Sequence, residues 1–108
     1  MLIDVRAQKI VKKRIDKARY IALSYVWGDS KQVMLTKPNL LKLLKDGALV
    51  HYYDYIPQVI RDAIQAVLTL EESFLWVDTL CIIQNDDQER DHQIKHMASI
   101  YNGALLIS

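Results

Sequence analysis

Long apolar runs along the chain predict the strands of a central sheet. Residues 75–84 (Leu-Trp-Val-Asp-Thr-Leu-Cys-Ile-Ile-Gln) and 20–27 (Tyr-Ile-Ala-Leu-Ser-Tyr-Val-Trp) are apolar on both faces. This pattern is typical of strands that are covered on both sides. A third apolar run, 104–107, follows an Asn-Gly pair that favours a helix end. We therefore expect 20–27, 75–77 and 104–107 to be parallel strands of one sheet.

Segments of helical period separate these runs. A short helix is predicted over 36–46, with Gly47 after its end. A longer helix is predicted from Pro57 to about Glu72, with a connection over 48–55 between the two. One stripe of the longer helix gathers its apolar side chains: Ile56, Ile60, Ala63, Ile64 and Val67.

A third helix is predicted to begin after Asn-Asp-Asp at 85–87. Asp86 and Glu89 have the spacing of a capping box, in which an N-cap side chain accepts from the main chain three residues on. We expect the buried side of this helix to consist of Ile94, Met97, Ala98 and Tyr101.

The N-terminus contributes two short β-like pieces, 2–5 and 8–11, which predict a β-hairpin at the sheet edge before a basic linker over 12–19. Alternation of strands and helices then predicts an α/β fold of three layers around a mostly parallel sheet. Because nothing after Ser108 covers the last strand, we expect the chain to be the front part of a larger unit.

Composition narrows the function classes. The 108 residues suit one small domain, and 51% hydrophobic content supports a core. A net charge of +1 gives no electrostatic reason to expect nucleic acid or a membrane surface as a partner. One cysteine excludes an intrachain disulfide, and neither a secretory signal nor an apolar run of about 18 residues is present. We expect a cytoplasmic protein.

Candidate binding residues lie at the predicted strand ends. Asp29 follows one strand and Asp78 the next, and the carboxyl ends of parallel strands are where ligands bind in open α/β sheets. Ser24 is the small polar residue inside the first of these strands. The structural alternative for Asp78 is an acid that ties down a turn or helix start through main-chain N–H groups.

Other motifs favour structure over chemistry. His92 and His96 have the spacing of a two-histidine metal site but point away from the apolar stripe, so we expect a solvated face and no metal. Cys81 stands among aliphatic residues and is expected to be buried and inert. The glycines are isolated, so a phosphate-binding loop is absent. These residues alone define no reaction.

Four blocks of sequence resemble the fungal heterokaryon-incompatibility (HET) domain family. Tyr-Ile-Ala-Leu-Ser-Tyr-Val-Trp-Gly-Asp at 20–29 is similar to its opening block, and 56–64 to its middle helix. Residues 75–86 resemble its second block, with Thr79 where alanine is more usual, and 93–101 resemble its third. The resemblance implies a partial HET domain over 1–108, with its core over 20–108.

The resemblance also implies a function. Members of this family trigger programmed cell death when genetically different hyphae fuse, so we expect a signalling module that self-associates or docks a protein partner. HET domains are remotely similar to TIR domains, which implies a TIR- or flavodoxin-like arrangement.

Some TIR domains cleave the nicotinamide–ribose bond of NAD with a glutamate, so an NAD-cleaving enzyme is the alternative. NAD is then a substrate, and no bound cofactor is expected with certainty. Glu89 is the candidate catalytic acid by its place in the chain. The expected ligand crevice is formed by Ser24, Trp27, Gly28, Asp29 and Asp78.

Overall fold

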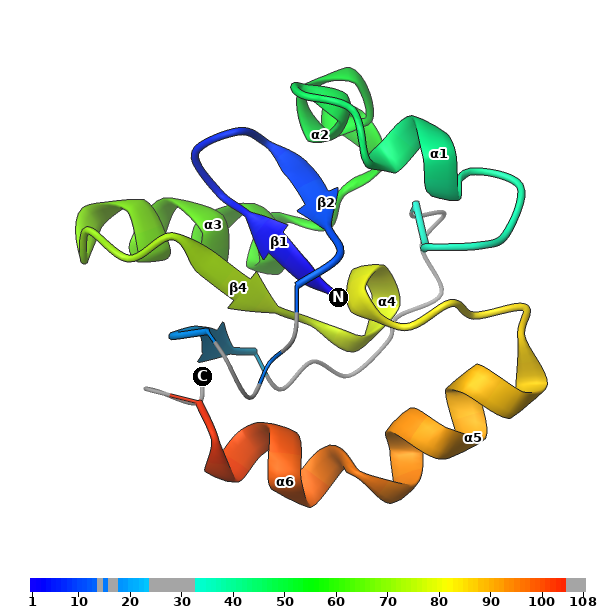
Figure 1. Ribbon diagram of the computed structural model, residues 1–108. Coiled ribbons are helices and arrows are strands. Elements are labelled where there is room, and N and C mark those ends of the chain that lie inside the picture. The colour runs from blue at the N-terminus through cyan, green and yellow to red at the C-terminus, as the bar shows by residue number, and fades with distance from the viewer. Residues whose placement is uncertain (14, 16–17, 24–32, 105–108) are drawn as a thin grey trace.

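The computed structural model describes residues 1–13, 15, 18–23 and 33–104. Four strands form one sheet in the order β2-β1-β4-β3 (Figure 1). The strands are β1 (Leu2–Asp4), β2 (Lys9–Val11), β3 (Ile21–Ala22) and β4 (Phe74–Trp76). Helices pack around this sheet, so the protein has a small α/β fold, as predicted.

The sheet is mixed. β3 runs parallel to β4, with Ile21 opposite Leu75, which confirms the predicted parallel neighbours. β1 runs antiparallel to both β2 and β4, with Ile3 opposite Leu75 on the other side of β4. The expectation of a mostly parallel sheet is therefore wrong for the described strands, because the N-terminal strand lies between β2 and β4. Of the third predicted strand, Ala104 lies outside any strand and 105–107 fall outside the described residues.

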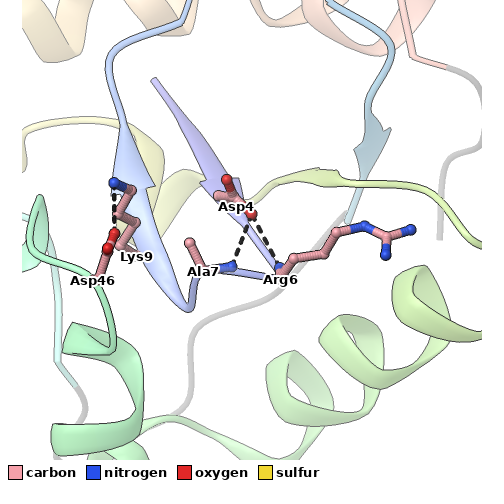
Figure 2. A network of polar contacts seen from close by, with 5 residues as sticks. All are labelled: Asp4, Arg6, Ala7, Lys9 and Asp46. Carbon is pink, nitrogen blue, oxygen red and sulfur yellow. Dashed lines mark hydrogen bonds and ion pairs between the residues drawn. The ribbon is translucent and has the colours of Figure 1, made fainter.

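A tight turn over residues 5–8 joins β1 to β2. The Asp4 carboxylate accepts hydrogen bonds from the main-chain N–H groups of Arg6 and Ala7, each at 3.0 Å (Figure 2). Gln8 has a φ of 56°, and its side-chain amide donates to the carbonyl oxygen of Val5 at 2.6 Å. Aspartate favours such turns because its short side chain caps the following main-chain donors.

Seven helical segments follow within the described residues. They are α1 (Leu40–Leu43), α2 (Ala48–His51), the 3₁₀ turn η2 (Tyr53–Tyr55), α3 (Gln58–Thr69), α4 (Asp78–Cys81), α5 (Asp87–Lys95) and α6 (Met97–Asn102). The helix predicted over 36–46 is limited to one turn, α1. The connection predicted over 48–55 is wrong, since α2 and η2 occupy it.

α3 has the predicted single buried face. Ile60, Ile64 and Val67 are buried, with Ile56 just before the helix, while Ala63 is half-buried. This face contacts β4 and covers one side of the sheet (Figure 1).

The third predicted helix is broken at His96 into α5 and α6. The predicted buried stripe is wrong in part. Ile94 is 49% exposed and Ala98 is exposed, whereas Ile100 is fully buried. The break shifts the helical phase, so the inward side of α6 differs from the one that a continuous helix would present.

Candidate functional site

Asp78 lies immediately beyond the carboxyl end of β4. The strand ends at Trp76, and Asp78 is the first residue of α4. Parallel pairing with β3 continues to this end of the sheet, since the main-chain N–H of Leu23 donates to the carbonyl oxygen of Trp76 at 2.9 Å. Leu23 therefore lies at the same end of the sheet as Asp78.

A hollow of about 140 Å³ opens beside Asp78. Arg90 and Ile94 of α5, with Met97 of α6, form its other wall. It brings an acid and a guanidinium to one rim. The sequence did not predict Arg90 as a site residue, because its position beside Asp78 depends on how α5 packs in the fold.

Gln84 fixes the loop on the floor of this hollow. Its side-chain amide donates to the carbonyl oxygens of Asp78 and Ile82, at 2.7 and 2.8 Å. Its main-chain N–H donates to the carbonyl oxygen of Leu35 at 2.8 Å. The segment between α4 and α5 is thus tied both to α4 and to Leu35, which is distant in the sequence.

The hydrogen bonds of Glu89 lie within the first turns of α5. Asp86 accepts a hydrogen bond from the main-chain N–H of Glu89 at 3.1 Å, which confirms the predicted N-cap. The Glu89 carboxylate accepts from the side-chain amide of Gln93 at 3.4 Å and is not part of the lining around Asp78. The structure therefore does not bring Glu89 and Asp78 into the same hollow.

Four further predicted site residues, Ser24, Trp27, Gly28 and Asp29, lie outside the described residues. The crevice that these residues are expected to share with Asp78 stays a prediction.

Cys81 is buried on α4, with 2% of its surface exposed. Burial raises the pKa of its thiol from 9.0 to about 11, because the thiolate would be desolvated. The sulfur lies 3.5 Å from the main-chain nitrogen of Val77. The prediction of a buried core cysteine is confirmed, and its inertness stays a prediction.

Thr79 departs from its neighbours on α4. Its side chain is fully buried, and its hydroxyl has no hydrogen-bond partner within the described part of the chain. A buried hydroxyl without a partner lowers stability.

His92 and His96 are exposed, as predicted, with ring centroids 4.4 Å apart. Among the described residues, no group of three His, Cys, Asp or Glu side chains is placed to hold a metal ion. None of the helices in the described ranges has the length and apolar character needed to cross a membrane.

Comparison with known proteins identifies the family. Residues 20–108 match the sequence model of the family described as heterokaryon incompatibility protein (HET). This covers most of the chain, so the protein belongs to the HET family.

A curated relative is heterokaryon incompatibility protein 6, OR allele, of Neurospora crassa. The two sequences are 33% identical over 95 residues, which cover 79% of this chain and 13% of that protein. The chain thus spans about an eighth of the length of the relative that it matches. No solved structure matches the chain.

Proposed function

We propose that this chain is an incompatibility signalling module, which promotes cell death in fungi by self-association or by docking a protein partner in the cytoplasm. The observation that carries the proposal is family membership, since the match to the HET family extends over residues 20–108. The name of the Neurospora crassa relative refers to the same process.

The described geometry agrees better with docking than with catalysis. A hollow of about 140 Å³ beside Asp78 is smaller than the roughly 300–1,000 Å³ typical of small-molecule sites. Two other acids of this region, Asp86 and Glu89, take part in the hydrogen bonds that begin and brace α5. A signalling module needs a stable surface and no assembled catalytic group.

Exposed apolar side chains supply a surface for such contacts. Several are concentrated between α1 and the start of α3, with exposed fractions from 44% to 75%: Leu41, Val50, Tyr53, Tyr55 and Val59. Tyrosine favours interfaces because its ring is apolar and its hydroxyl is polar.

A three-layer arrangement is proposed in which the sheet extends beyond β3. β3 is the last of the described strands on that side, so a further strand has a position beside it. Parallel addition there would give the three-layer, TIR-like arrangement.

Induced expression in fungal hyphae tests this function. The chain, and the longer protein if the gene encodes one, is expressed while cell viability and the apparent mass of the purified protein are measured. Killing that is lost in Val50→Lys but kept in Gln65→Lys, a control change at an exposed position of α3, supports docking. Full viability with both wild-type proteins would overturn the proposal.

NAD cleavage is the second candidate, favoured by one observation. Asp78 and Arg90 face one hollow at the carboxyl end of β4, the edge where α/β sheets bind ligands. An acid there stabilises the positive charge that develops on ribose as nicotinamide leaves and water adds. Nicotinamide release from NAD by the purified protein, lost in Asp78→Asn or Glu89→Gln, supports this candidate. Absence of release with killing intact removes it.

A further inference from the structure

A second hollow, of about 340 Å³, lies where α1 meets α2. Lys42 on α1 and Lys45 after it contribute to its lining, as do His51 and Tyr52 at the end of α2. None of these residues lines the hollow beside Asp78. Its volume falls within the roughly 300–1,000 Å³ of small-molecule sites.

The charge of this corner is positive. Asp46 is the acid of the lining, and its carboxylate is paired with the ammonium group of Lys9 at 2.7 Å (Figure 2). Within the part of the chain that the structure describes, neither Lys42 nor Lys45 is paired with an acid. The hollow is therefore lined by two lysines that have no carboxylate partner among the described residues.

The corner is fixed to the turn between β1 and β2 by main-chain hydrogen bonds. The N–H of Gly47 donates to the carbonyl oxygen of Ala7, and that of Leu49 to the carbonyl oxygen of Gln8, both at 2.8 Å. Gly47 has a φ of 76°, a conformation that favours glycine, and it turns the chain from α1 into α2. A hollow held in this way loses little conformational entropy when a ligand binds.

Its rim also offers an aromatic ring. Tyr52 is half-buried and packs edge-on against His51, with ring centroids 5.1 Å apart and an interplanar angle of 88°. Both rings line the same hollow as Lys42 and Lys45. A ligand that suits the corner combines negative charge with a flat or apolar part.

We propose that the α1–α2 corner binds a small organic phosphate, of which a nucleotide is the representative. Lysine ammonium groups donate charge-assisted hydrogen bonds to phosphate oxygens. The ring of Tyr52 contacts the base or sugar. The site is independent of the proposed signalling function and of Asp78.

Calorimetric titration of the whole chain with ADP, pyrophosphate and adenosine tests the ligand class. ADP binding more tightly than either of the other two supports the proposal, because charge and ring both contribute. Equal binding of ADP and pyrophosphate, equal binding of ADP and adenosine, or no heat with ADP at millimolar concentration overturns it.

Variants locate the site. Lys45→Glu and Lys42→Glu are each expected to weaken ADP and pyrophosphate by about tenfold or more, the effect of losing one charged hydrogen bond. Lys95→Glu, a matched change on exposed α5, is expected to leave both unchanged. Tyr52→Leu should weaken the binding of ADP and leave the binding of pyrophosphate unchanged. Equal losses in Lys45→Glu and Lys95→Glu would show attraction by overall charge and overturn the site; circular dichroism verifies that each variant is folded.

Discussion

The hydroxyl of Tyr20 donates a hydrogen bond to the main-chain carbonyl oxygen of Ile100, across 80 positions of sequence. Both residues are buried, with exposed fractions of 1% and 0%. Tyr20 directly precedes β3, and Ile100 lies in the middle of α6. This bond therefore ties the last described helix to the edge of the sheet.

Removal of this hydroxyl tests the tie. Tyr20→Phe keeps the ring but leaves the Ile100 carbonyl oxygen buried without that donor, so we expect the free energy of unfolding to fall by about 1–3 kcal/mol. Urea denaturation measures the change. Tyr53→Phe, an exposed tyrosine, is the control and should change little; equal stability of Tyr20→Phe and wild type would show that the bond contributes nothing.

A substitution at Gly103 tests the same contact between Tyr20 and α6. A Cβ atom at Gly103 would lie 2.9 Å from the Tyr20 hydroxyl oxygen and 3.3 Å from the carbonyl oxygen of Ser99. We expect Gly103→Ala to cost about 1–3 kcal/mol through this crowding.

A double-mutant cycle checks that explanation. In a Tyr20→Phe background the closest oxygen is gone, so Gly103→Ala should cost less than it does in the wild type. Additive losses would contradict contact with the hydroxyl as the cause.

Thr79 gives a stabilising prediction. Thr79→Val replaces a buried hydroxyl that has no partner in the described residues by a methyl group of similar shape, so we expect a gain of about 1 kcal/mol in the free energy of unfolding. Thr69→Val is the matched control on α3, where the hydroxyl is exposed and donates to the carbonyl oxygen of Gln65 at 3.0 Å. A loss of stability in Thr79→Val would mean that the hydroxyl is satisfied in solution.

The raised pKa of Cys81 predicts that the protein loses stability at alkaline pH. Burial raises the pKa of its thiol from 9.0 to about 11, so the folded state keeps the proton that the unfolded state loses. The contribution of the protonated thiol to the free energy of unfolding is present in full below pH 9. It is lost as pH rises to about 11, at a slope of up to about 1.4 kcal/mol per pH unit.

Comparison with Cys81→Ala isolates this contribution, since burial also raises the pKa of Tyr20. The wild-type protein should lose more stability than the variant between pH 9 and 11 in denaturant titrations. Parallel pH profiles would contradict a buried thiol. Because Cys81 is the single cysteine, its slow reaction with a thiol reagent at pH 8 provides an independent check.

Features set by local periodicity could be predicted from the sequence. The buried face of α3 follows from the spacing of its isoleucines, and the Asp86 cap from its distance to Glu89. Pairing of β3 with β4 follows from two apolar runs separated by helices.

Features set by distant contacts could not be predicted. The antiparallel pairing of Ile3 with Leu75 depends on which strand reaches β4, and the sequence around neither residue determines it. The periodicity also did not predict the break at His96, and Ile94, expected to be buried, is 49% exposed. In the candidate site, the rim position of Asp78 was predictable, whereas its neighbour Arg90 depends on where α5 lies.

The position of β1 determines which residues an expressed version of this protein needs to include. The family match begins at residue 20, yet β1 fills the slot between β2 and β4 and Leu2 and Ile3 are fully buried. A fragment trimmed to the match would leave an uncovered strand edge, a template for aggregation. Expression of this family member should therefore retain residues 1–19, because the cooperative unit is larger than the segment by which the family is recognised.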